Sequence, residues 1–389
     1  MRLKHPDGTI VHLSSGTNVL PAEEVDGLVA QVGGIGGGVR DALGAARIGL
    51  GLWLPAEAAF ALAADPVGVD RLRQQLDRHG IEVVTLNAFP YAGFHDPVVK
   101  KKVYSPDWSQ RLRLDYTVAC ATVLSRLLPD DVERGSISSL PLGWRTPWLA
   151  DRQSAAMAHL GELATSLEKL RADTGRHIRV ALEPEPGCVV ETSADVVERL
   201  AGVNPEWVGV CLDLCHLAVG FEPAEDARAN IAKAGLSVVK VQAAAALHVQ
   251  DPGDAETREA LEGFSEDRFL HQVRQRAGAR VLGRDDLDQA ITGDRPMRTG
   301  SPWRVHFHVP VNTDPAPPLR NTSQDLIASL TDLFGGATAH ADHVEVETYT
   351  WDVLPPGMRP TDEAGLVRGL AGELAWVRDE LIEIGLEVA

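Results

Sequence analysis

The chain has 389 residues, of which 44% are hydrophobic, and it carries a formal net charge of −18 at pH 7. This acidic total argues against a nucleic acid as a partner, because nucleic-acid binding draws its affinity from cationic contacts to phosphates, although it leaves a local basic groove open. No apolar run reaches the length of a membrane span, and residues 1–8 lack the apolar core of a signal peptide, so we expect a cytoplasmic protein without membrane insertion.

Short apolar runs alternate with helical patterns along the whole chain. Nine runs are strand candidates, and they begin near residues 10, 47, 81, 136, 178, 207, 236, 303 and 343. Strands that alternate with helices form a parallel sheet covered by helices, so we predict an α/β fold, a (β/α)8 TIM barrel, with residues 1–389 as a single domain. Since a closed barrel needs eight strands, either the first candidate is a peripheral hairpin or the strands flanking an insertion share one place.

Two stretches interrupt this alternation. Residues 33–38 are rich in glycine and trail a predicted helix, and no Lys-Ser or Lys-Thr pair follows them, so a flexible loop is favoured over a phosphate-binding loop. Residues 243–300 are charged and show no regular pattern. We predict that they are an insertion in the barrel that serves as a lid, as an arm of a homo-oligomer, or as both.

The run Val-Ala-Leu-Glu-Pro-Glu-Pro-Gly at residues 180–187 ends a predicted strand in two carboxylates. Proline lacks an N–H group, so Glu183 and Glu185 are expected at the C-terminal end of this strand. Residues two apart in an extended chain point the same way, so both carboxylates face one side. Like charges this close are unfavourable unless a cation, an arginine or a shared proton relieves them, and a metal ion is the simplest solution.

Other predicted strands end in polar residues of the same kind. Barrel enzymes place their active sites at the C-terminal ends of the strands. The candidates there are Asn87, Glu183, Glu185, Asp213, His216, Lys240, Gln242, His306, His308, Glu345 and Glu347. Carboxylates and imidazoles that come from separate strands form a site with nitrogen and oxygen ligands, which suits divalent Mn, Mg, Co, Zn or Fe.

Each of these residues also has a structural explanation. A carboxylate at a strand end is often a helix cap. His216 lies just past a strand end, where a ligand, a substrate-binding group or a helix cap are all compatible with the pattern, and Lys240 fits an acid–base group, a substrate clamp or an ion pair. His306 and His308 face the same side of their strand, and their polar neighbours favour a functional role. The four cysteines are scattered, so we expect buried free thiols.

Several of these motifs resemble those of xylose-isomerase-type enzymes. Glu183-Pro-Glu-Pro186 is similar to their Glu-Pro-Lys-Pro run, whose Glu binds metal, and Asp213-x-x-His216 resembles their acid-x-x-His pair. His306-Phe-His308 resembles the His-x-His strand of ketose 3-epimerases, in which the second His is a ligand, and Glu347-Thr-Tyr resembles their last metal-binding Glu. Glu185 stands where the sugar isomerases have a catalytic Lys, and this departure argues against aldose isomerisation by hydride shift.

A closer resemblance extends over nearly the whole chain. The runs that carry it are Asn87-Ala-Phe-Pro-Tyr91, Val103-Tyr-Ser-Pro-Asp-Trp108, Ser136-Ile-Ser-Ser-Leu-Pro-Leu-Gly143, Cys211-Leu-Asp-Leu-Cys-His216, Lys240-Val-Gln242, His306-Phe-His-Val-Pro310 and Glu345-Val-Glu-Thr-Tyr-Thr-Trp351. Together they resemble the EboE-type proteins, a family of xylose-isomerase-like barrels encoded in the Ebo clusters, which are associated with the movement or maturation of secondary metabolites. The resemblance implies the fold and a metal site, and it implies no particular reaction. Ser14-Ser-Gly-Thr-Asn18 departs from the Cys-Thr-Asn expected at that point.

The leading hypothesis is a divalent-metal-dependent isomerase or epimerase that acts on a small sugar- or cyclitol-like polyol. The metal, held by Glu183, Asp213, Glu347 and either Gln242 or His308, would polarise a carbonyl and an adjacent hydroxyl. Glu185 or Glu345 would act as the general base, and His216 and Lys240 would steady the enediolate oxygens. The candidate substrate-binding residues are Asn87, His306 and Trp351.

Two other functions are compatible with the same residues. A carrier protein would keep the barrel and bind a metabolite without turning it over, in agreement with the traffic role of the Ebo clusters. A metal-dependent phosphoester hydrolase would use additional ligands such as His306 and Glu345. The net charge of −18 argues against DNA as the substrate of such a hydrolase but leaves a small phosphoester open.

Overall fold

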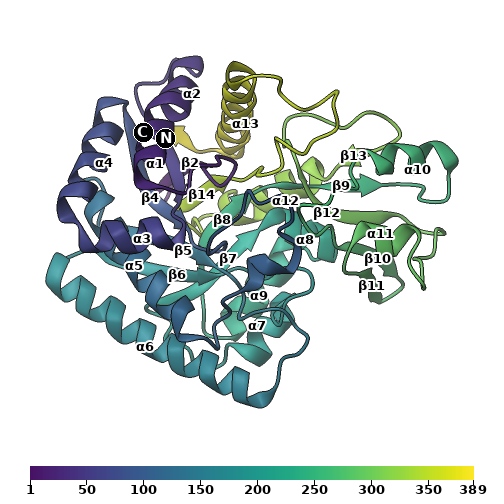
Figure 1. Cartoon of the computed structure of the whole chain (residues 1–389), viewed down its shortest axis with the longest axis horizontal. Helices are drawn as coiled ribbons and strands as arrows, with labels where there is room; N and C mark the ends of the chain where they lie inside the picture. Colours follow the sequence, from purple (N-terminus) through teal and green to yellow (C-terminus); the bar gives the residue numbers. More distant parts are fainter.

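The computed structural model describes residues 1–389, and a closed barrel forms its core (Figure 1). Eight parallel strands run in sequence order around the barrel, and the last of them pairs with both its predecessor and the first strand, which closes the sheet. The strands are β2 (Ile10–Gly16), β3 (Ile48–Trp53), β4 (Ile81–Asn87), β5 (Arg134–Ser139), β6 (His177–Leu182), β7 (Val208–Asp213), β8 (Val238–Ala243) and β14 (His343–Val346). The predicted TIM barrel is therefore confirmed.

Helices occupy every crossover between these strands. They are α1 (Val25–Gln31), α2 (Gly37–Ala42), α3 (Ala56–Ala64), α4 (Pro66–Arg78), α5 (Arg111–Leu127), α6 (Ala150–Thr174), α7 (Ser193–Arg199), α8 (Leu214–Gly220), α9 (Ala224–Lys233), α10 (Ala255–Glu262), α11 (Leu287–Ile291) and α12 (Ser323–Phe334), with α13 (Glu363–Ile384) after the last barrel strand. None of these helices is both long and apolar enough to cross a membrane.

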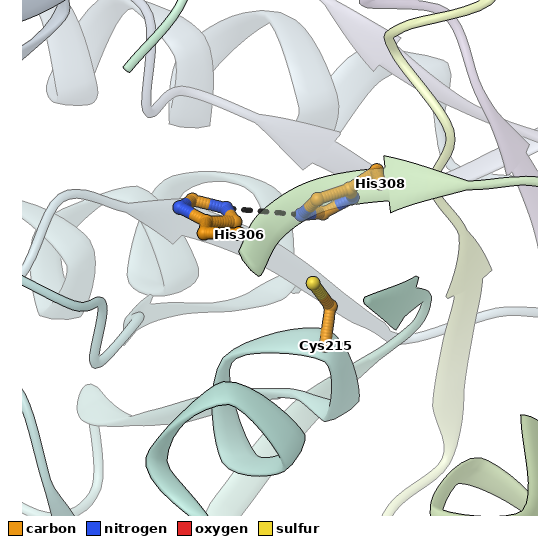
Figure 2. A group of neighbouring side chains, drawn as sticks. All are labelled: Cys215, His306 and His308. Carbon is orange, nitrogen blue, oxygen red and sulfur yellow. Dashed lines mark hydrogen bonds between the residues drawn. The ribbon is translucent and has the colours of Figure 1, made fainter. Parts of the chain in front are cut away.

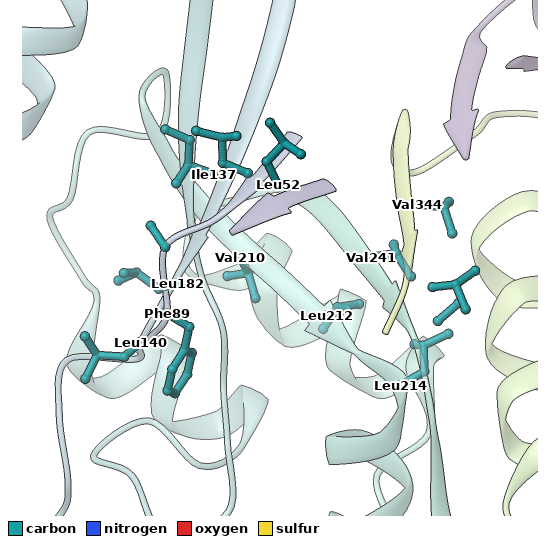
Figure 3. Close-up of a cluster of buried hydrophobic side chains, with 14 of the residues drawn as sticks. Leu52, Phe89, Ile137, Leu140, Leu182, Val210, Leu212, Leu214, Val241 and Val344 are labelled. Carbon is teal, nitrogen blue, oxygen red and sulfur yellow. The ribbon is translucent and has the colours of Figure 1, made fainter. Parts of the chain in front are cut away.

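Most positions of the barrel strands are buried because both faces of the sheet are covered, although β5 consists mainly of polar residues. β3, β7 and β8 are buried at every position. Ile137, Leu182, Val210 and Val241 come from four different strands and belong to one core cluster (Figure 3). Burying a side chain of this kind contributes roughly 1.5–3 kcal/mol. The four cysteines are buried and free, as expected.

The ninth strand candidate, β12 (Trp303–Val309), lies outside the barrel. It belongs to a five-stranded antiparallel sheet with β9 (Ala245–Val249), β10 (Val273–Ala277), β11 (Arg280–Arg284) and β13 (Arg320–Asn321). Both explanations offered for the ninth candidate are wrong, since the first candidate is the barrel strand β2 and no place in the barrel is shared. β12 resembles a barrel strand because it too is almost fully buried.

Residues 33–38 are helical, contrary to the loop expected from the sequence. They span a π-helical turn (Val32–Gly36) and the start of α2. A Cβ atom on Gly36 would lie 2.8 Å from Cδ1 of Ile81 and 3.0 Å from Cδ1 of Leu50, and a Cβ on Gly38 would lie 3.2 Å from Val367. Glycine therefore serves close packing of this helix against the barrel and against α13.

The N-terminal end of the barrel holds a buried carboxylate, Glu82 in β4. It is 3% exposed, and Arg2 Nε donates to its Oε2 at 2.9 Å. The N-terminal amine of Met1 and Nδ1 of His12 lie 3.7 and 3.4 Å from its Oε1. Burial by itself would raise the pKa of Glu82, but its contacts with His12, the amine and Arg2 lower that pKa to about 2.

Replacing Glu82 with Gln should lower the free energy of unfolding at pH 7 by about 3 kcal/mol. A depressed carboxyl pKa contributes stability that is present above the ordinary value of 4.5 and is lost as the pH falls toward about 2. The difference between wild type and Glu82→Gln should therefore shrink over this interval. Urea unfolding at a series of pH values measures it, and a difference independent of pH would contradict the assignment.

Candidate metal centre and active site

A pocket with a cavity volume of about 60 Å³ lies at the C-terminal ends of the barrel strands. Its polar lining residues are Asn18, Asn87, Lys100, Glu183, Glu185, His216, His306, His308 and Glu347. Its apolar and aromatic lining residues are Phe89, Pro90, Phe94, Val99, Val103, Tyr104, Phe269, Leu270 and Tyr349. The pocket thus combines a group of acids and imidazoles with a largely apolar wall.

Three carboxylates from three barrel strands meet in this region. Glu183 follows β6 directly, Asp213 is the last residue of β7 and caps α8, and Glu347 follows β14 directly. One oxygen of each lies within 4.8 Å of one oxygen of each of the others, and all three side chains are buried. The structure thus brings these three residues together at one mouth of the barrel, as predicted from the sequence.

The donor set of these carboxylates fits a divalent cation. Oε2 of Glu183 is buried without a hydrogen-bond partner. Burial raises the pKa values of Glu183 and Glu347 well above the ordinary range, and the neighbouring carboxylates raise them further. A cation placed between the three groups would remove this repulsion and supply the missing partner of Oε2.

Gln242 in β8 stands closer to this group than His308 does. Its Nε2 donates to Oε2 of Glu347 and lies 3.5 Å from Oδ2 of Asp213, and the Cys211 thiol donates to its Oε1 at 3.1 Å. A half turn of the amide would direct Oε1 to the carboxylates as a fourth ligand. Of the two alternatives left open by the sequence, the geometry favours Gln242.

His216, His306 and His308 form a second polar group beside the carboxylates. His216 comes from α8, and the other two come from β12, so the antiparallel sheet contributes directly to the barrel mouth. The ring centroid of His306 lies 4.6 Å from the ring centroid of His216 and 5.2 Å from the ring centroid of His308. Burial lowers the pKa values of all three, for His216 to about 4, so the imidazoles are neutral at pH 7.

Glu185 lies on the wall of the pocket next to these histidines. Its Oε1 accepts a hydrogen bond of 2.6 Å from the Tyr104 hydroxyl and lies 3.8 Å from Nδ1 of His306. Burial raises the pKa of Glu185 to about 8, even though the bond from Tyr104 counteracts part of this rise. Glu185 is therefore a carboxyl whose proton is held and released near neutral pH.

Lys240 and Glu345 face each other away from the pocket lining. Nζ of Lys240 lies 3.1 Å from Oε2 of Glu345, and both side chains are fully buried. Burial by itself would lower the pKa of Lys240. Its contact with Glu345 raises that pKa, and the nearby carboxylates of Glu347 and Glu183 raise it further. Neither side chain lines the pocket, so neither can touch a molecule bound there. This agrees with the ion-pair explanation for Lys240 and argues against the catalytic roles predicted for Lys240 and Glu345.

Of the three predicted substrate-binding residues, two line the pocket and one does not. Asn87 lines the pocket, and its Nδ2 donates to Oε1 of Glu347 at 2.8 Å. His306 also lines the pocket. Trp351 does not, because its indole N–H donates to Oε2 of Glu373 at 2.9 Å and its ring packs against Gly369.

Three residues of the site were not predicted as site residues from the sequence. Asn18 donates to Oε1 of Glu347 at 2.6 Å, Tyr104 holds Glu185, and Gln272 accepts from Nδ1 of His306 at 2.7 Å. Asn18 follows the end of β2, so the rule that marks the other strand ends would have found it. Tyr104 lies in one of the runs that carry the closer resemblance, which could have marked it, whereas Gln272 lies in a segment without regular periodicity and no motif includes it.

The fold is similar to that of two solved proteins, an epimerase and a magnesium-bound barrel. D-allulose 3-epimerase from Methylomonas sp. matches with a TM-score of 0.51 at 11% identity, covering 97% of this chain and 100% of that one. A xylose isomerase-like TIM barrel protein from Mycobacterium smegmatis in complex with magnesium matches with a TM-score of 0.51 at 11% identity, covering 95% and 98%. At these identities the likeness shows the fold alone. No curated protein matches the sequence significantly.

A family model described as xylose isomerase-like TIM barrel matches residues 41–277. This range is more than half of the chain, and it includes the barrel strands β3 to β8 with Glu183, Asp213 and Gln242. By sequence, and in agreement with its closed barrel, the chain belongs to the xylose isomerase-like TIM barrel family.

Proposed function

We propose that the protein is a divalent-metal-dependent isomerase or epimerase that acts on a small sugar- or cyclitol-like polyol. The observation that carries the proposal is the meeting of Glu183, Asp213 and Glu347 in one buried group next to the carboxyl of Glu185. The epimerase named among the similar folds, and the magnesium bound in another, support the same reaction class.

Glu183, Asp213, Glu347 and Gln242 would hold the cation. When bound, it supplies a Lewis acid for a carbonyl and an adjacent hydroxyl of the substrate. Asn18 and Asn87 both donate to Oε1 of Glu347 and so fix the orientation of that ligand.

Glu185 is the proposed general base. In its ionised form it would take the proton from the carbon next to the substrate carbonyl and return it to the former carbonyl carbon, which completes an isomerisation; an epimerisation needs a second acid on the opposite face of the enediolate. Tyr104 orients the carboxylate through its bond to Oε1. Lys240 and Glu345 would support the barrel beneath the site and not contact the substrate.

The lining favours a substrate without a phosphate group. Lys100 is the one lysine or arginine in it, and its Nζ is bound to Oδ2 of Asp286 at 2.6 Å. The apolar wall includes Phe269 and Leu270 from the segment between β9 and β10, so we propose that this part of residues 243–300 acts as a lid. The resemblance to EboE-type proteins suggests a metabolite of a secondary pathway as the substrate.

The experiment is turnover of a panel of keto-sugars and cyclitol ketones, each with its phosphorylated counterpart, in the presence of Mn²⁺. We expect epimerised or isomerised product by mass spectrometry and NMR, with the unphosphorylated members preferred. Tight binding of a panel member that is recovered unchanged would instead identify a carrier and overturn the proposal.

Glu185→Gln should lower kcat/KM by about 100-fold or more while the affinity for Mn²⁺ is retained, because general base catalysis is lost and the cation ligands remain. The matched control is Glu198→Gln, an exposed carboxylate in α7 outside the pocket lining. It should keep near wild-type activity. Equal activity of wild type and Glu185→Gln would remove Glu185 from the reaction.

A further inference from the structure

Glu373 in α13 is a buried carboxyl group that the proposed reaction does not use. It is fully buried and does not line the pocket. Its Oε1 accepts hydrogen bonds from the Thr348 hydroxyl at 2.6 Å and from the Val311 N–H at 3.1 Å, and its Oε2 accepts from the Trp351 indole N–H at 2.9 Å. Burial raises the pKa of Glu373 to about 7, although these three bonds counteract part of the rise. Above this pH the ionised carboxylate, which only accepts hydrogen bonds, satisfies all three donors at once.

The surface of α13 around Glu373 allows other segments to come close. Gly369, Gly372 and Glu373 follow the i, i+3, i+4 pattern and therefore share one face of the helix. A Cβ atom on Gly369 would lie 2.6 Å from the ring of Trp351, and a Cβ on Gly372 would lie 2.9 Å from Nδ2 of Asn312. The two glycines thus let the segments that follow β14 and β12 reach the carboxylate.

The segment after β14 is bound to Glu373 at two points. Thr348 directly follows Glu347, the proposed cation ligand, and Trp351 lies further along the same segment. Tyr349 lies between these two contacts and lines the pocket, as Glu347 does. Because Glu373 and Trp351 do not line the pocket, they hold this segment from outside while Glu347 and Tyr349 contribute to the site.

The end of β12 is bound to the same carboxylate. Val311 lies just beyond β12, the strand that carries the pocket residues His306 and His308 (Figure 2). Nδ1 of His308 donates to the carbonyl oxygen of Glu347 at 2.9 Å, so the two segments are also bonded to each other. β12 belongs to the antiparallel sheet and β14 to the barrel, so Glu373 joins the two parts of the structure that form the site.

We propose that Glu373 is a positioning residue of the active site, which acts through Thr348 and Trp351 on the orientation of Glu347 and Tyr349. The inference rests on the proposed function, in which Glu347 is a cation ligand. Mutating an outer contact of a metal ligand typically costs roughly 10–100-fold in metal affinity. Glu373 reaches the ligand through the neighbouring Thr348, so the expected effect is at the lower end, about 10-fold.

An amide at position 373 cannot replace the carboxylate. The Glu373→Gln side chain has one acceptor oxygen and one donor nitrogen, so in either orientation its NH₂ group faces a donor, which is the Trp351 indole N–H or the Val311 N–H. Replacing Trp351 with Phe removes the first of these opposing donors. The combination of Glu373→Gln with Trp351→Phe should therefore be less harmful than Glu373→Gln alone.

Calorimetric titration of the full-length protein with Mn²⁺ at pH 8 tests the proposal. Glu373→Gln should bind Mn²⁺ about 10-fold more weakly than wild type, and the double variant with Trp351→Phe should recover most of this loss. The matched control is Glu82→Gln, a buried carboxyl at the opposite end of the barrel, which should lose stability and keep the wild-type Kd. A Kd that is equal in wild type and Glu373→Gln would overturn the positioning role and leave the proposed function intact.

Hydrogen–deuterium exchange of the metal-free protein measures the same contact without a cation. Peptides that cover residues 347–354 should exchange up to about 10-fold faster in Trp351→Phe than in wild type, which is the effect of losing one hydrogen bond of typical strength. This variant keeps the carboxylate and so covers the case in which Glu373→Gln does not fold. Unchanged exchange in these peptides would overturn the proposal. Faster exchange in a protein whose wild type binds no Mn²⁺ would reject the proposed function and retain Glu373 as the residue that holds this segment.

Discussion

Replacing Glu183 with Gln should abolish Mn²⁺-dependent turnover and at the same time stabilise the metal-free protein. The two effects have one cause. Glu183 is buried beside Asp213 and Glu347, and its raised pKa means that the folded state disfavours its charge in the absence of a cation. A neutral amide removes this unfavourable charge, but it is also a poorer ligand.

Thermal unfolding with and without Mn²⁺ measures the stability effects. At a free Mn²⁺ concentration of 100 times Kd, wild type should gain about 2.7 kcal/mol, and Glu183→Gln should gain almost nothing. The control is Glu82→Gln, a buried carboxyl at the opposite end of the barrel, which should lower the baseline stability and keep the full gain from Mn²⁺. A destabilised metal-free Glu183→Gln protein would show that the carboxylate is stabilised by a partner within the protein and does not need a cation.

Replacing Lys240 with Met should lower the free energy of unfolding by about 3–5 kcal/mol, because it leaves the charge of Glu345 buried and unpaired. Lys240 Nζ also lies 3.1 Å from the hydroxyl of Ser138, so that contact is lost with the ion pair. Water cannot replace the ammonium group, since both members of the pair are fully buried.

The double variant Lys240→Met with Glu345→Gln should recover most of this loss, since no charge then remains in the barrel interior. Urea unfolding of both single variants and the double variant gives the coupling energy. Arg73→Met, which removes the exposed pair of Arg73 and Asp130, is the surface comparison and should cost less than about 1 kcal/mol. Equal losses in the single and double variants would mean that the pair is not coupled.

The eight barrel strands were predictable from the sequence, and so was the convergence of most of the proposed metal ligands. In a parallel barrel every strand is buried on both faces, so an apolar run predicts a strand. Because all strands run in the same direction, a polar residue at the C-terminal end of such a run is predicted to lie at one mouth of the barrel. Glu183, Asp213 and Glu347 follow this rule, and Asn18 would have followed it too.

The tertiary structure decided the place of β12, which no local pattern distinguishes from a barrel strand. It also decided which polar residues face the pocket: Lys240 and Glu345, close in sequence to Gln242 and Glu347, turn toward each other instead. The orientation of the His216 and His306 rings depends on the Pro184 carbonyl and on Gln272, which lie far from them in the sequence. Periodicity is a local property of the chain, whereas the partner of a buried polar atom is set by packing between distant elements.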